Sequence, residues 1–337
     1  MAFPTTNEIL TIIRESGISL DGGETVQAVN LLRPVYSKEI MLQALPVMRF
    51  YQFAKVHTEL LTTPGVTIKM MTFNNLKRGT ALTEGVRMKT QALNSAMKDI
   101  TVQEYGNAVS VTEMTLKASF VNVMEQAVIQ LSRDLALVVD ILLRDTALAG
   151  GNETSTIYGR QTGGAKVAAR NAIEENVNTL TVATIKDALE ILATNNAPRW
   201  NADYYICFVH PHQSRTLRDD PAWINISNYG APTAQFYGEI GRIDNVRFIE
   251  TTLMCNGAAA EEDDAYKAEL KAAGKGGANV YQAVLFGENY YGFAIGMEAE
   301  IRDGGIIDFS REHSIAWYGI FGAGCLNPEY GVVIETA

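Results

Sequence analysis

The chain of 337 residues is 47% hydrophobic and 20% charged, which is ordinary globular usage and excludes a disordered or fibrous protein. Its 28 basic and 38 acidic residues give a net charge of -10, so the chain as a whole lacks the positive surface that grips nucleic acid. The 3 cysteines are widely spaced and exclude a disulfide framework, and no apolar run approaches the ~20 residues of a membrane span. We therefore expect a soluble, cytosolic chain with reduced thiols and, from its length, about two domains.

Residues 1–56 have the pattern of an arm. Thr5 starts a capping-box sequence ahead of an apolar run, and Gly17 is a natural stop, so a short amphipathic helix is predicted there. A second apolar stretch follows Arg33 and Pro34. These side chains need a surface to cover, either on the body of the same chain or on a neighbour.

Two β-rich tracts, residues 66–73 and 99–111, alternate partly in hydrophobicity and are predicted to pair as one hairpin. The connection between them is much longer than an ordinary hairpin loop. We therefore expect the hairpin, with its flanks over 57–111, to project from the core.

The same region is strongly basic. Between positions 69 and 98, 6 basic residues stand against the single acid Glu84, whereas the chain as a whole is acidic. Two interpretations stay open: the basic residues can simply keep a loop solvated, or they can dock on the acidic surface of another copy, where charge sets specificity and encounter. Docking would assign subunit-interface roles to Lys77, Arg78, Arg87 and Lys89.

Residues 122–149 carry the strongest helical periodicity in the chain, and Gly150 and Gly151 follow as a stop. A helix of that length spans about 42 Å. Because it is apolar on more than one side, we predict a structural spine packed on several faces. It belongs to a unit over 112–179, whose remainder is rich in Gly, Asn and Thr and indicates loop.

A second module, predicted from residue 180, mixes helix and strand. A helix over 182–192 and a buried strand over 204–209 precede a helix that begins at Pro211 and a strand over 246–251. This order predicts a sheet with helices packed against it.

The remaining sequence is a low-complexity segment followed by β-type sequence. Residues 256–279 are rich in Ala and Gly and charged, which predicts a surface insertion. Residues 280–301 and 306–335 consist of short aromatic and aliphatic runs separated by Gly, which is typical of strands that close a sheet.

Metal or catalytic chemistry has little support. His210 and His212, with Asp219 nearby, form the only cluster that suggests a metal, yet HExxH and CxxC partners are missing. Helix capping or turn packing is the favoured interpretation, and a metal-dependent hydrolase built on these residues stays as the enzyme alternative. The sequence has neither a P-loop nor GxSxG, so we expect no cofactor and no enzyme activity.

Three tracts in combination resemble the major capsid proteins of tailed bacteriophages, particularly the podovirus-type, coliphage N-four-like family. They are NNAPRWNADYYICFVHPHQSRTLRDDPAWIN, GEIGRIDNVRFIETT and WYGIFGAGCLNPEYGVVIE, at 195–225, 238–252 and 317–335. The resemblance implies an α+β tailed-phage capsid fold with these parts: N-terminal arm 1–56, extended β-hairpin loop and flanks 57–111, peripheral domain with spine helix 112–179, axial domain 180–300 including the insertion 256–279, and closing strands of the peripheral domain 301–337.

The same resemblance implies a structural function. Such a protein self-assembles through hexamers and pentamers into an icosahedral shell around a double-stranded DNA genome, which it contacts only weakly and without sequence specificity. Scaffolding, portal and decoration proteins are further candidate partners, and no membrane is involved. The expected location is the virion capsid, assembled in the host cytoplasm. A cellular nanocompartment shell protein of the same fold, enclosing cargo enzyme, is the alternative.

Overall fold

The computed structural model describes residues 48–337 except for 63–64, 74–75, 77, 80, 82–83, 86, 89, 94, 121, 151–154, 161–163, 222, 224–237, 256–268 and 310. Most of the expected arm, including the predicted helix after Thr5, lies outside the described residues. The end of the arm that is described packs into the molecule, because Phe50 and Phe53 are both buried in the main hydrophobic core.

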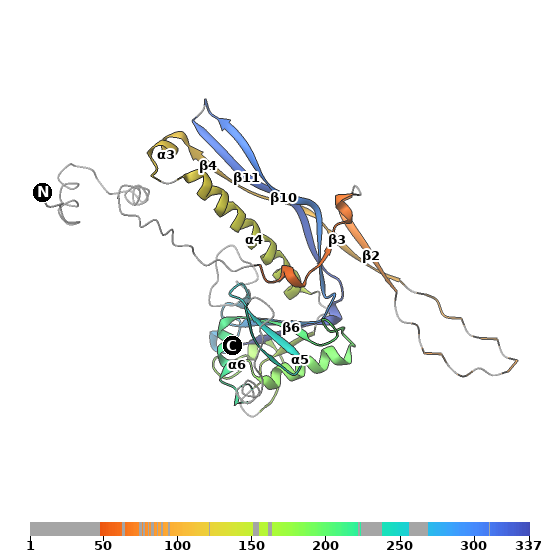
Figure 1. Cartoon of the computed structure of the whole chain (residues 1–337). Coiled ribbons are helices and arrows are strands. Elements are labelled where there is room, and N and C mark those ends of the chain that lie inside the picture. The colour runs from red at the N-terminus through yellow and green to blue at the C-terminus, as the bar shows by residue number, and fades with distance from the viewer. Residues whose placement is uncertain are drawn as a thin grey trace.

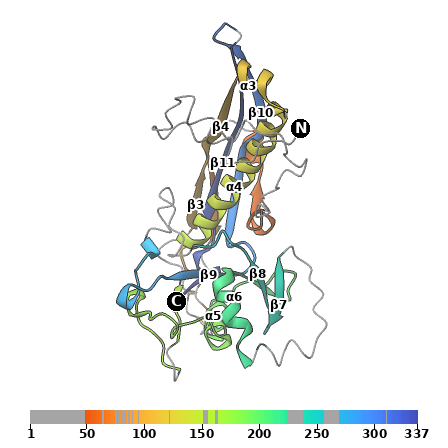
Figure 2. The same cartoon turned by 90° about the vertical axis from the view of Figure 1, so that its left-hand side faces the viewer.

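A long sheet in the order β1-β10-β11-β4 extends away from the rest of the described molecule (Figure 1). Its strands are β1 (Lys55–His57), β10 (Tyr291–Ile307), β11 (Glu312–Cys325) and β4 (Gln103–Thr112). β10 and β11 form a long antiparallel hairpin, and β4 lies antiparallel on the other side of β11. The short helix α3 (Glu113–Ala118) follows β4 at the far end (Figure 2).

Helix α4 (Val123–Ala149) runs along the long sheet and confirms the long helix predicted as the spine. The Asn122 side chain accepts a hydrogen bond from the backbone N–H of Glu125, and Gly150 ends the helix by donating its N–H to Thr146. These contacts satisfy backbone groups that a helix end leaves open. The inward face buries Leu131 and Leu143 against the sheet, so the helix and sheet share one core.

A compact sheet in the order β5-β12-β9-β6-β8-β7 forms the other part of the described molecule. Its strands are β5 (Ser155–Tyr158), β12 (Gly331–Thr336), β9 (Tyr281–Phe286), β6 (Tyr205–Val209), β8 (Val246–Glu250) and β7 (Glu239–Ile243). Helices α5 (Val182–Thr194) and α6 (Pro211–Arg218) accompany it, which confirms the predicted helix-strand-helix order. Short 3-10 turns are η1 (Tyr51–Phe53), η2 (Glu59–Leu61), η3 (Arg170–Ala172), η4 (Lys275–Gly277) and η5 (Pro328–Tyr330).

The predicted hairpin exists, but its second strand was assigned wrongly. β2 (Thr67–Phe73) pairs with β3 (Ser95–Thr101), from Thr67 opposite Thr101 to Phe73 opposite Ser95. The tract 99–111 is divided at Val102, and everything beyond it forms β4 of the long sheet. The alternation of hydrophobicity that marks a strand does not reveal which strand it pairs with, so two strands were merged into one.

The expected closing segment 301–337 is also divided. β11 lies in the long sheet, whereas β12 lies in the middle of the compact sheet, between β5 and β9. β10 begins at Tyr291, before the expected boundary at 300, and belongs to the long sheet. All six residues of β12 are buried, as expected for a central strand covered on both faces. The end of the chain therefore ties the two parts together.

The predicted surface insertion 256–279 is only partly described. In its described end, Leu270 is 1% exposed and belongs to the main core. This part of the segment is thus anchored in the fold rather than lying wholly on the surface.

Candidate functional site

The connection between β2 and β3 carries the candidate interface residues. Arg78 and Arg87 are exposed there, whereas Lys77 and Lys89 lie outside the described residues. The β2–β3 hairpin stands apart from the compact sheet (Figure 1). Large apolar side chains are exposed in the same connection, namely Leu76, Met88 and Leu93 at 60%, 62% and 64%. In the described part of this connection, exposed cations therefore stand beside exposed apolar side chains.

The arm enters the molecule beside a buried acid of the spine. Asp140 is 1% exposed, and its Oδ1 accepts hydrogen bonds from the backbone N–H of Phe50 at 2.8 Å and of Arg49 at 3.1 Å. The phenol of Tyr291 donates to the Phe50 carbonyl at 2.7 Å. Burial raises the pKa of Asp140, and burial followed by the Asp140 charge raises the pKa of Tyr291. We name Asp140, Tyr291 and the backbone of 49–50 the arm latch.

The C-terminal half of the spine is fixed to the rest of the chain by buried polar groups. Arg144 is fully buried, and its Nη1 donates to the Leu253 carbonyl at 3.0 Å while Nη2 donates to Asp145 at 2.6 Å. Nearby, the Tyr290 phenol donates to the Ala147 carbonyl at 2.6 Å. These bonds hold α4 in one position relative to the segments around it.

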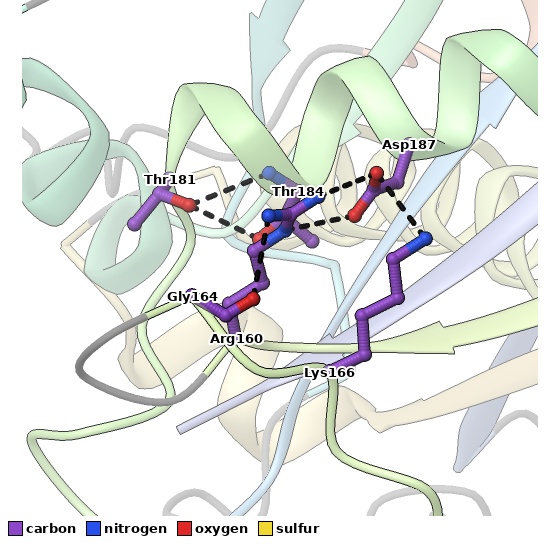
Figure 3. Close-up of polar contacts among 6 residues, drawn as sticks. All are labelled: Arg160, Gly164, Lys166, Thr181, Thr184 and Asp187. Atoms are coloured by element: carbon purple, nitrogen blue, oxygen red, sulfur yellow. Dashed lines mark hydrogen bonds and ion pairs between the residues drawn. The ribbon is translucent and has the colours of Figure 1, made fainter.

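In a charged cluster beside α5, the charged side chains pair with one another. Arg160 donates from Nε and Nη2 to both oxygens of Asp187, at 2.9 and 2.6 Å, and Lys166 lies 3.3 Å from the same carboxylate (Figure 3). Thr181 caps the helix by accepting from the backbone N–H of Thr184. The bidentate pair uses both carboxylate oxygens, so the cluster anchors Arg160 and Lys166 to α5.

The histidine cluster has a structural role, as predicted. His210 caps α6: its Nδ1 accepts from the backbone N–H of His212 at 3.1 Å, and its own N–H donates to the Gln213 side chain. The His212 ring stacks on Tyr281 with centroids 4.3 Å apart. Burial, followed by the nearby Arg215 charge, lowers the pKa of His212. Asp219 lies at the other end of α6.

Across the described residues, no group of three His, Cys, Asp or Glu side chains is placed to hold a metal ion. No helix in the described part of the chain is long and apolar enough to cross a membrane.

Comparison with known proteins identifies the family. The sequence matches the family described as phage capsid protein over residues 96–334, which is most of the chain. The chain belongs to the phage capsid protein family. This capsid protein is therefore a structural protein of a phage shell, and the predicted function is confirmed at that level, whereas the hydrolase and nanocompartment alternatives are not favoured. No curated protein sequence matches the chain.

Solved phage capsids share the fold of this capsid protein. The cyanophage Pam1 capsid has a TM-score of 0.70 at 16% identity, covering 95% of this chain and 98% of that chain. The Ralstonia phage GP4 capsid has a TM-score of 0.68 at 16% identity, covering 95% and 97%. The cyanophage P-SCSP1u capsid has a TM-score of 0.65 at 17% identity, covering 100% and 99%. The predicted tailed-phage capsid fold is confirmed, and the podovirus-type subfamily stays a prediction.

Proposed function

We propose that the capsid protein self-assembles through hexamers and pentamers into an icosahedral shell that encloses a double-stranded phage DNA genome. In this proposal the long sheet with α4 is the peripheral domain and the compact sheet is the axial domain. The shell forms in the host cytoplasm, with scaffolding, portal and decoration proteins as its further partners. The net charge of -10 suits a container that holds DNA without binding it tightly.

The observation that carries the assembly mechanism is the exposed, basic β2–β3 connection on an acidic chain. Arg78 and Arg87 are presented to solvent away from the compact sheet, together with exposed apolar side chains. On a neighbouring copy the predominant surface charge is negative, so the connection and its docking surface attract one another. Such rim charges act mainly on the rate of encounter and on the choice of partner. The apolar side chains then hold the contact once it has formed.

Charge reversal in this connection tests the proposal. Lys77→Glu combined with Arg78→Glu is expected to slow assembly and reduce the yield of shells, while circular dichroism and the thermal midpoint of the unassembled chain stay unchanged. The matched control is Lys186→Glu with Lys271→Glu, which makes the same change in net charge outside the connection. Shells formed at normal rate and yield by the Lys77 and Arg78 variant would contradict the docking role.

A further inference from the structure

The far end of the long sheet exposes apolar side chains to an unusual degree. Among the described residues, the three most exposed large hydrophobic side chains are Phe309 at 100%, Phe120 at 92% and Met114 at 82%. Phe309 lies in the turn between β10 and β11, and the other two lie on α3 and just after it, at the same end of the molecule (Figure 2). We name the described residues 112–120, 305–309 and 311–312 the tip.

The backbone at the turn is unfavourable for the residue that occupies it. Asp308 and Phe309 have φ values of 48° and 53°, in the left-handed region. Asn, Asp and Gly adopt this conformation readily, whereas a bulky aromatic residue there is an outlier. A fully exposed ring gains nothing from burial within its own chain. Folding alone therefore does not account for an aromatic side chain at position 309.

A cavity of about 440 Å³ lies beside the turn. It is lined by Thr112, Glu113, Met114, Lys117, Arg311 and Glu312. Its walls are held together, because the Glu113 N–H donates to the Arg311 carbonyl at 2.7 Å and the Lys117 ammonium lies 2.6 Å from the Glu113 carboxylate. Met114 and the aliphatic stems of Lys117 and Arg311 give the cavity apolar surface beneath a charged rim.

We propose that Phe309 of one copy inserts into this cavity on the tip of a neighbouring copy. The proposal rests on self-assembly and adds a second contact, separate from the β2–β3 connection. The turn and the cavity are different surfaces of the same tip, so the contact is heterologous and closes into a ring of copies when the rotation allows. The rim carries both signs of charge, and the incoming turn also carries both through Asp308 and Arg311, so opposite charges are present on the two surfaces to pair when a second copy docks.

A buried aromatic anchor surrounded by polar side chains is the usual form of an interface hot spot. Phe309 would supply the anchor, and the charged rim of the cavity would exclude water around it. This assignment accounts for an aromatic residue at a position where the backbone favours Asn or Gly. It also predicts opposite effects of one substitution on folding and on assembly.

Cross-linking of assembled shells tests the contact. In the double variant Asp308→Cys with Lys117→Cys, which keeps Phe309 and Met114, a short bismaleimide reagent is expected to link the tips of different copies, giving covalent oligomers up to the size of one ring. Asp308→Cys alone measures the background, which includes links to the half-buried Cys325, because Cys207 and Cys255 are buried. Asp308→Cys with Ala193→Cys, which places the second thiol on α5, is the matched control and is expected to give no closed oligomers.

Substitution at position 309 gives the second readout. Phe309→Asn is expected to leave the thermal midpoint of the unassembled chain unchanged or higher, because Asn suits the left-handed backbone, and to raise the concentration needed for assembly by about thirtyfold. Phe309→Tyr keeps the ring and is expected to assemble normally. Normal assembly of Phe309→Asn would overturn the proposal. A thermal midpoint of the unassembled variant so low that unfolding explains its assembly defect would also overturn it.

The outcomes separate this inference from the proposed function. Shells that form without tip cross-links in the Asp308 and Lys117 double variant overturn the contact and leave the proposed function intact. Absence of shells from the unmodified chain, expressed alone or with the proteins encoded beside it, overturns both. Shells with tip cross-links and a specific assembly defect in Phe309→Asn support both.

Discussion

The arm latch predicts that a single buried acid controls how firmly the end of the arm is held. Asp140→Ala removes the acceptor for the backbone N–H groups of Arg49 and Phe50. Phe50 is fully buried, so its N–H would have no water to replace the carboxylate. Because Phe50 and Phe53 pack in the main core, loosening the latch is expected to lower global stability rather than local order alone.

The magnitude follows from the bonds that are lost. A hydrogen bond to a charged group contributes about 1.5 to 3 kcal/mol, and Asp140 accepts from two donors. The cost of burying the carboxylate offsets part of this gain, as the raised pKa of Asp140 shows. The expected loss for Asp140→Ala is therefore about 2 to 4 kcal/mol in the free energy of unfolding. Asp140→Asn keeps one oxygen acceptor for Phe50 and is expected to lose about half as much.

The pH dependence has a definite sign. Burial raises the pKa of Asp140 above its usual value of 3.8, so between 3.8 and the raised value the folded chain binds more protons than the unfolded chain. The stability that this residue contributes therefore rises as the pH falls through that window, whereas Asn does not titrate. The difference in unfolding free energy between the unmodified chain and Asp140→Asn is expected to widen on acidification, by at most about 1.4 kcal/mol per pH unit.

Urea unfolding followed by circular dichroism, repeated at several pH values from about 7 down to about 4.5, measures both quantities. The comparison of each variant with the unmodified chain cancels the titration of other groups. A loss below about 1 kcal/mol for Asp140→Ala, or a difference that narrows as the pH falls, would refute the reasoning.

Two further substitutions test contacts between segments that are distant in the sequence. Arg144→Met leaves the buried Leu253 carbonyl without its donor and should lower the free energy of unfolding by about 3 kcal/mol in urea unfolding, and a loss under about 1 kcal/mol would contradict this. Gly331→Ala places a methyl group against the Tyr290 ring and should cost about 1 to 3 kcal/mol, seen as a lower thermal midpoint. Gly79→Ala, in open space, is its control, and equal midpoints for the two variants would refute the packing argument.

Local signals in the sequence predicted the helices whose first and last residues can be recognised from capping residues. The spine was predictable because Asn122 and Gly150 mark its ends and its apolar periodicity is continuous. The helix at Pro211 was predictable for the same reason, and the capping role of His210 followed from its position just before it.

Pairing between distant segments was not predictable from local signals. β12 (Gly331–Thr336) pairs with β5, more than 170 positions earlier in the chain, and with β9, and nothing in its own residues indicates those partners. Likewise β3 and β4 form one continuous β-rich tract in sequence and belong to different sheets. Long-range pairing depends on the packing of the whole chain rather than on the alternation within one strand.

The candidate functional sites also differ in how far the sequence alone reveals them. The basic connection was visible as a cluster of charge in the sequence, although its docking role stays a prediction. Asp140 had a signal, an acid within the most apolar run of the chain, but its partners at 49–50 lie about ninety positions away. The exposure and backbone of Phe309 had no signal, because the turn sequence around it contains the polar residues of any surface turn.

Electron cryomicroscopy of particles made by the chain, expressed alone and with the proteins encoded beside it, tests self-assembly most directly. The predicted result is closed shells of five- and six-membered rings, with the β2–β3 connection of each copy lying on a neighbour. Small oligomers of fixed size in both preparations, with no closed shell at any protein concentration or ionic strength, would contradict it.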